Sequence, residues 1–147
     1  MDALRARVRR RLEAGAEIVE FALVLPLLLF VMIGIFDFGF MFRDYGVITN
    51  AAREGARIGV LAGYSDDDVR ARAASYMTTA GLTPDPGDTY VDPIDLVVGG
   101  RTVHWVRVTV FYHHTFSFLA PIATLVGQSF GSITLRAVST MRVEGPA

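Results

Sequence analysis

Residues 16–36 read AEIVEFALVLPLLLFVMIGIF, twenty-one residues of which the last sixteen carry no charge. At about 1.5 Å rise per residue, a helix of this length spans about 31 Å, which matches the hydrocarbon thickness of a bilayer. Five arginines precede the run within the first eleven residues, whereas Asp37, Arg43 and Asp44 follow it. The positive-inside rule therefore predicts a single-pass membrane helix with a cytoplasmic N-terminus and a periplasmic or extracellular domain over residues 37–147.

A cleaved secretory signal peptide is an alternative interpretation, because it also has a basic start and an apolar centre. In this chain the apolar run leads into Asp-Phe-Gly-Phe-Met-Phe-Arg at 37–43, which contains no small-x-small cleavage site. The run is also longer than an ordinary signal core. A membrane anchor is therefore the favoured interpretation.

The composition limits what the rest of the chain can be. A length of 147 residues allows one ordinary domain, and the chain contains no cysteine for a disulfide framework or a thiolate metal site. Beyond Phe36 there are nine arginines and eleven acidic residues, which gives no basic excess. Nucleic-acid binding is disfavoured on this charge balance.

Two residues conflict with a simple anchor, Glu20 at the start of the apolar run and Pro26 inside it. An intramembrane acid is expensive and needs a named partner. If the chain is cut between Gly15 and Ala16, Glu20 lies four residues after the new α-amino group, on the same helical face, and the two charges can pair. Glu20 as an interfacial carboxylate that reaches the headgroups is the alternative. Pro26 kinks the helix, and a harmless kink remains an equal alternative to a role in assembly.

The residues around this acid resemble a known processing site. Gly15-Ala16-Glu17-Ile18-Val19-Glu20-Phe21 is similar to the site of type IV pilin-like proteins, at which a prepilin peptidase cleaves after a glycine. The wider string GAEIVEFALVLP at 15–26, followed by Asp-Phe-Gly at 37–39 and NAAREGAR at 50–57, resembles the TadE-like family of tight-adherence pilus assembly proteins.

The resemblance implies a function and a set of partners. It implies a minor pilin or pseudopilin that is processed after Gly15, with Ala16, Glu20 and Phe21 completing the processing site. The implied partners are the prepilin peptidase, a major pilin, other pseudopilins, an inner-membrane assembly platform and membrane lipid. A permanently anchored binding or sensory domain, never processed, is the alternative function.

After the membrane, the apolar spacing predicts that the helix continues over 37–62 as an amphipathic stem. A row of small residues at Ala51, Gly55, Gly59 and Gly63 would let another backbone approach closely. The sheet of the same chain is favoured over another subunit as the element that packs there. Within the family-like motif, Arg53, Glu54 and Arg57, together with Gly55, are candidates for contact with the folded domain or a partner, although a solvated face is the simpler interpretation of the three charged residues.

The remaining sequence predicts a small α+β domain, in which the long helix packs on an antiparallel sheet. Ser65 followed by three aspartates predicts an N-cap and a helix over 66–80 that Gly81 ends. Residues 83–95 contain three prolines and are expected to be mostly loop. Strands are expected at about 89–98, 102–112 and 132–144, with a hairpin at Gly99-Gly100. The apolar stretch 116–126 is too short to recross the bilayer.

Metal sites and catalysis find little support in the pattern. Calcium binding by Asp85, Asp88, Asp92 and Asp95 is disfavoured because these residues lack the EF-hand spacing. His113 and His114 are neighbours on a predicted strand and point to opposite faces. No phosphate-binding glycine loop or nucleophile motif is present in the sequence, so we expect neither a cofactor nor an enzymatic activity.

Overall fold

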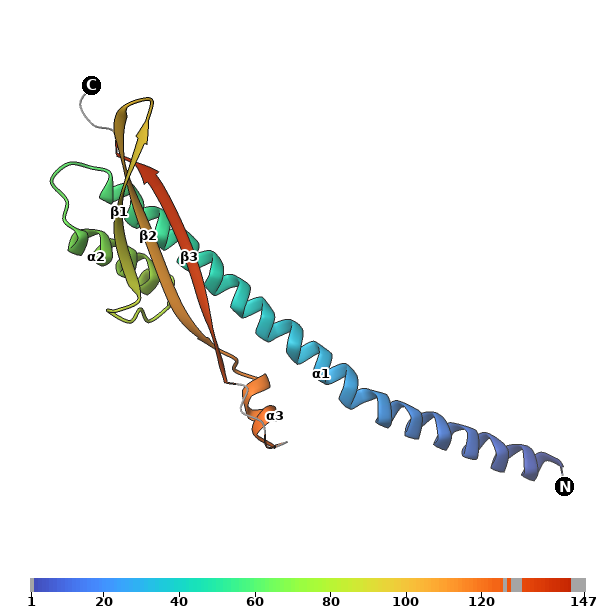
Figure 1. The fold of residues 1–147 in the computed structure, drawn as a ribbon. Coiled ribbons are helices and arrows are strands. Elements are labelled where there is room, and N and C mark those ends of the chain that lie inside the picture. The colour runs from blue at the N-terminus through green and yellow to red at the C-terminus, as the bar shows by residue number, and fades with distance from the viewer. Residues whose placement is uncertain (1, 126, 128–130, 144–147) are drawn as a thin grey trace.

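The computed structural model describes residues 2–125, 127 and 131–143, and for residues 2–14, 16 and 125 it describes the backbone alone. One long helix carries a small domain at its C-terminal end (Figure 1). This arrangement of a long apolar helix and a small antiparallel sheet confirms the predicted α+β class. The elements, in chain order, are α1 (Asp2–Gly59), α2 (Asp66–Thr79), β1 (Thr89–Val98), β2 (Arg101–Thr115), α3 (Leu119–Leu125) and β3 (Ser132–Arg142).

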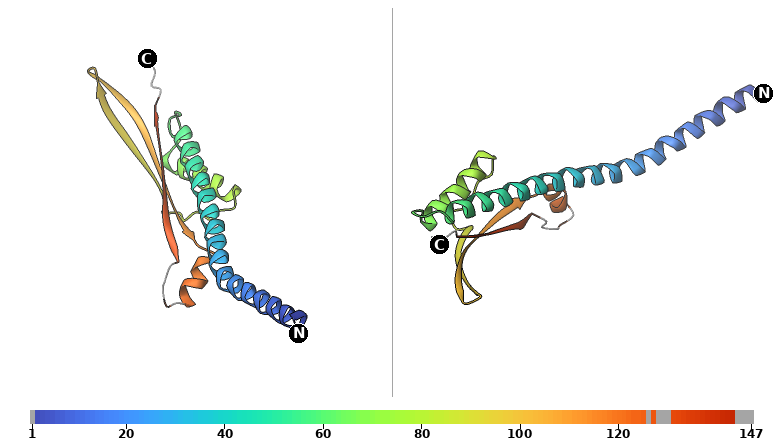
Figure 2. Two further views of the ribbon diagram at one scale, coloured as in Figure 1. Left: turned by 90° about the vertical axis from the view of Figure 1, so that its right-hand side faces the viewer. Right: turned by 90° about the horizontal axis from the view of Figure 1, so that it is seen from above.

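Helix α1 is continuous over 58 residues and passes Pro26 without a break. It is curved along its length (Figure 2). Its end at Gly59 comes before the expected end at residue 62, so that expectation was wrong by about one turn. The chain turns here because α2 must fold back onto α1, and Gly63, with φ of +91°, takes the left-handed conformation that this turn requires.

Helix α2 begins with a capping box. The Ser65 hydroxyl accepts a hydrogen bond from the Asp68 backbone N–H, and the Asp68 carboxylate accepts one from the Ser65 backbone N–H at 2.8 Å. A hydrogen bond donated by the Ser65 hydroxyl to the Asp68 carboxylate at 2.7 Å, followed by the bond from the Ser65 backbone N–H, lowers the pKa of Asp68. At the other end Gly81, with φ of +84°, follows the last turn, as expected for a glycine that ends a helix.

The three strands form one antiparallel sheet in the order β1-β2-β3. Gly99 and Gly100, with φ of +60° and +79°, make the turn between β1 and β2, as a two-residue hairpin of this hand requires. Strand β1 has the bounds of the strand expected at about 89–98, so the expectation that residues 83–95 are mostly loop holds only up to Asp88. Pro93 is accommodated because β1 is an edge strand, where one side of the backbone needs no partner.

The strands β2 and β3 extend beyond or stop short of their expected ends. Strand β2 continues to Thr115, three residues past the expected 112, because residues 105–115 are paired with β3. The expected end of the last strand at residue 144 lies outside the described residues, and β3 itself ends at Arg142. Part of the apolar stretch 116–126 forms the short helix α3, and residue 126 is not among the described residues.

The core lies between the C-terminal part of α1, helix α2 and one face of the sheet (Figure 1). Gly55 and Gly59 allow α2 and the sheet to pack closely against α1. A Cβ added at Gly59 would lie 3.0 Å from Val106 and 3.2 Å from Val69, and one at Gly55 would lie 3.4 Å from Val108. The row of small residues therefore faces the sheet and α2 of the same chain, except Gly63, which lies beyond the helix. Fully buried core residues include Ile48, Ala51, Ala52, Ala56, Val69, Ala73, Met77, Val108 and Val110.

Candidate functional site on the N-terminal helix

The residues of the predicted processing site all lie within α1. An added Cβ at Gly15 would meet no atom within 4 Å, and Glu20 is exposed. Phe21 is also exposed. The side chain of Ala16 lies outside the described residues. The structure thus leaves Gly15, Glu20 and Phe21 open to a partner, as a processing or assembly site requires.

The apolar run forms a bare surface on α1. Within the described residues, one helix is long and apolar enough to cross a membrane, over Glu17–Gly59, and the most apolar eighteen-residue window of this segment has a mean hydropathy of 2.7 and no buried residue. Large apolar side chains on every side of this segment are exposed, among them Leu23, Leu27, Phe30 and Ile35. Such a surface is compatible with a single-pass membrane anchor.

The charged residues of the stem join α1 to α2. Glu54 accepts hydrogen bonds from Arg72 of α2 at 2.9 Å and from Arg57 at 3.3 Å. The bond from Arg72, followed by that from Arg57, lowers the pKa of Glu54. Arg53 contacts Asn50 at 3.4 Å and is exposed. Among the three charged residues of the motif over 50–57, Glu54 is therefore the one that bonds to α2, while Arg53 and Arg57 remain accessible.

Gly55 and Pro26 occupy different surroundings. Gly55 is buried against Val69 and Val108 of its own chain, where a larger residue would press on both. Pro26 lies in the exposed apolar part of α1. A partner contact at either residue stays a prediction, and for Gly55 such a contact would have to act through the packing of α1 on the sheet.

Two buried carboxylates were missed by the reasoning from sequence. Asp37, with 1% of its surface exposed, accepts hydrogen bonds from the backbone N–H groups of Ser117, Phe118 and Leu119, the shortest at 2.7 Å. Its side chain therefore caps the N-terminal end of α3. The available signal was an acid directly after an apolar run, within the family-like Asp-Phe-Gly.

Asp44 is the second buried carboxylate, and it lies about two helical turns beyond Asp37. Its Oδ2 atom is 2.8 Å from Nδ1 of His114, and both side chains are less than 10% exposed. Burial raises the pKa of nearby Tyr112, and the negative charge of Asp44 adds to the effect. This pair fixes the C-terminal end of β2 on α1.

The candidate metal ligands are separated. Asp92 and Asp95 lie on β1 opposite Arg107 and His104, and Asp95 contacts His104 at 2.7 Å. His113 and His114 point to opposite faces of the sheet, one exposed and one buried. Among the described residues, the group that comes together is Asp85, Asp88 and His113, whose ligand atoms lie within 4.8 Å of one another on the surface. Exposed acidic groups of this kind are common without an ion.

Comparison with known proteins gives one match. Residues 15–57 match the model of the family described as TadE-like protein. No curated protein and no solved structure matches the chain. The match covers the processing site, the apolar run, Asp37 and the stem motif. It indicates involvement in the assembly of the tight-adherence pilus. The resemblance seen in the sequence is therefore confirmed over residues 15–57, where the chain is similar to the TadE-like family.

Proposed function

We propose that the chain is a minor pilin or pseudopilin of a tight-adherence pilus, made as a precursor and cleaved by a prepilin peptidase after Gly15. The observation that carries the proposal is the exposure of Gly15 and of residues 17–21 at the start of a family-matched apolar helix. The chain itself performs no chemistry in this role.

The membrane orientation follows from the charges. Arg5, Arg7, Arg9, Arg10 and Arg11 keep the leader over residues 1–15 in the cytoplasm, the run over 16–36 crosses the inner membrane, and the domain over 37–147 lies outside. Cleavage after Gly15 removes all five arginines. Without that cationic anchor, α1 can leave the bilayer for an assembly.

Glu20 supplies the pairing group in this assembly. An acid beside an apolar membrane run is costly without a partner, and Glu20 lies at the start of such a run. The α-amino group created at Ala16 lies four residues away on the same helical face, within one subunit or on a neighbour. A low dielectric strengthens this pair.

The implied partners fall into two groups. The prepilin peptidase and the inner-membrane platform act on the precursor, and the major pilin and other pseudopilins meet the mature helix. The long exposed apolar surface of α1 suits contact with lipid before extraction and with other pilin helices afterwards.

The test is the mass of the protein extracted from membranes of the producing cell. The proposal predicts a mature N-terminus at Ala16, and Gly15→Leu should leave the leader attached. Gly46→Leu is the matched control, since an added Cβ at Gly46 also meets no atom within 4 Å and should leave cleavage intact. An intact leader in the working protein would favour the permanently anchored binding or sensory domain instead.

A second experiment isolates the pairing role. Glu20→Gln should permit membrane insertion and cleavage but lower pilus output, because the new amine loses its partner. Glu17→Gln removes an equally exposed acid three residues earlier and should leave output unchanged. Equal pilus output from both variants would contradict the role of Glu20.

A further inference from the structure

We propose that α3 is embedded in the outer leaflet of the membrane beside α1, and that lipid acyl chains fill the apolar groove between the two helices. The inference rests on the membrane insertion of α1 used in the proposed function. It adds a second membrane contact, made by the C-terminal third of the chain.

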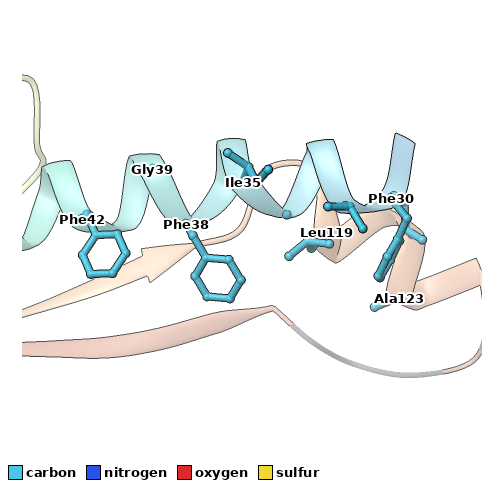
Figure 3. Close-up of a pocket in the computed structure, with 10 residues that line it drawn as sticks. Phe30, Ile35, Phe38, Gly39, Phe42, Leu119 and Ala123 are labelled. Carbon is cyan, nitrogen blue, oxygen red and sulfur yellow. The ribbon is translucent and has the colours of Figure 1, made fainter. Parts of the chain in front are cut away.

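The groove lies between the middle of α1 and α3 (Figure 3). Its volume is about 1040 Å³, and apolar side chains and glycines line it. Figure 3 shows Phe38 and Phe42 pointing from α1 toward the same side as Leu119 and Ala123 of α3. A groove of this size and composition is costly to leave open to water.

The same groove is continuous with the membrane-crossing surface. Phe30 and Ile35 line it and belong to the predicted span over 16–36. Since α3 contacts α1 at this level, it lies beside the outer end of the span rather than above it. Whatever solvent surrounds Phe30 and Ile35 therefore also reaches α3.

The charge of Asp37 does not interrupt this surface. Its carboxylate is buried under α3 and bonded to three backbone N–H groups, so it faces neither lipid nor water. The exposed surface of α1 is consequently free of charge from Phe21 to Phe42, between Glu20 and Arg43. These 22 residues span about 33 Å at about 1.5 Å each, close to the roughly 30 Å of bilayer hydrocarbon. The span therefore moves from residues 16–36 to about residues 21–42. Glu20 then lies at its inner boundary, and the outer boundary of the membrane lies near Arg43, beyond α3.

The N-terminal end of α3 meets the requirement that lipid imposes. Polar backbone groups in hydrocarbon must be bonded within the protein. The N–H groups at the start of α3 donate to Asp37, the Thr124 hydroxyl donates to the Pro121 carbonyl at 2.7 Å, and Pro121 has no N–H. Residues 116–125 carry no charge, and Phe118 is 49% exposed. The segment therefore has an uncharged exterior and hydrogen-bonded backbone N–H groups at its start.

The test uses the absence of cysteine from the chain. Full-length Phe118→Cys carries a nitroxide spin label in phosphatidylcholine vesicles at a high lipid-to-protein ratio, and collisions with oxygen and with a water-soluble nickel chelate are compared. Leu28→Cys serves as the lipid reference and Val97→Cys, at the hairpin, as the water reference, because both residues are exposed. Ser117→Cys repeats the measurement without removing an aromatic ring.

The proposal predicts that positions 117 and 118 resemble position 28, with a log ratio of oxygen to nickel collisions shifted upward from that at position 97. A ratio equal to that at position 97, while position 28 reads as lipid, would overturn the proposal and leave the anchored topology standing. Low collision rates with both reagents at 117 and 118 would mean that a second copy covers the groove, and would also overturn it. A water-like reading at position 28 would show that the insertion of α1 itself had failed.

Discussion

Two consecutive segments of α1, residues 21–42 and residues 43–59, present opposite kinds of surface. Over residues 21–42 the large apolar side chains point outward and stay exposed, whereas over residues 43–59 the buried positions are held mainly by small residues such as Ala51, Ala52 and Ala56. Both segments belong to the same α-helix, so secondary structure does not distinguish them. Side-chain size does, because a sheet can approach a helix closely only where the helix carries small residues. A helix meant for lipid has no such requirement.

Replacing one isoleucine in each segment by alanine tests the difference between the two segments most directly. Ile48 is fully buried and Ile35 is 66% exposed. Ile48→Ala should lower the free energy of unfolding by about 2–5 kcal/mol, because it loses buried surface and leaves a cavity. Ile35→Ala should change it by less than about 0.5 kcal/mol. Denaturant unfolding of the full chain in detergent micelles, followed by the fluorescence of Trp105, measures both. Equal losses of unfolding free energy would mean that residues 21–42 of the helix also support the fold of the domain.

Glycine substitutions sharpen the same comparison at a smaller expected effect. Gly59→Leu should destabilise the domain by about 1–3 kcal/mol, because its first side-chain atom already meets Val106 and Val69. Gly34→Leu should not destabilise it, since an added Cβ at Gly34 meets no atom within 4 Å. The midpoint of the same unfolding transition reports the difference. A stable Gly59→Leu variant would show that the sheet can move away from α1.

The smallest effect concerns the charged face of the stem and depends on pH. The pKa of Glu54 is lowered in the folded protein by Arg72 and then Arg57, so its contribution to stability is present above the unfolded pKa of about 4.3 and disappears as pH falls through the folded pKa. Arg72→Gln should raise the Glu54 pKa, seen by NMR titration of its side chain, and weaken the loss of stability on acidification. Arg70→Gln is the control, because Arg70 pairs with Asp67. Identical titrations in the two variants would contradict the assignment.

Local patterns predicted much of this molecule. The apolar run, the Ser65 cap, the glycine pair of the hairpin and the alternation in the strands each depend on residues close together in the sequence. For the same reason the apolar segment of α1 over residues 21–42 can be recognised from its residues alone. Strand β1 was expected at the bounds it has, but residues 83–95 were also expected to be mostly loop, because proline argues against a central strand and the sequence does not reveal which strand lies at an edge.

The unpredicted contacts are those between distant segments. Asp44 meets His114 across 70 positions, and Asp37 meets Leu119 across 82. Nothing in the local pattern identifies either pair, since each acid is a single polar residue on an otherwise amphipathic helix. The same limit hid the groove, which needs α3 beside α1 in order to exist. The close approach of Gly55 and Gly59 to the chain's own sheet was favoured in advance, but their contact residues were not.

The bonding of Asp37 has a consequence for the order of events during synthesis. Its three backbone donors are made 80 to 82 residues later than the acid itself. Under the proposed topology, a nascent chain that has inserted α1 has a carboxylate without these donors until most of the polypeptide has crossed. Export of the last part of the chain, rather than entry of the first, then supplies the hydrogen bonds to this carboxylate.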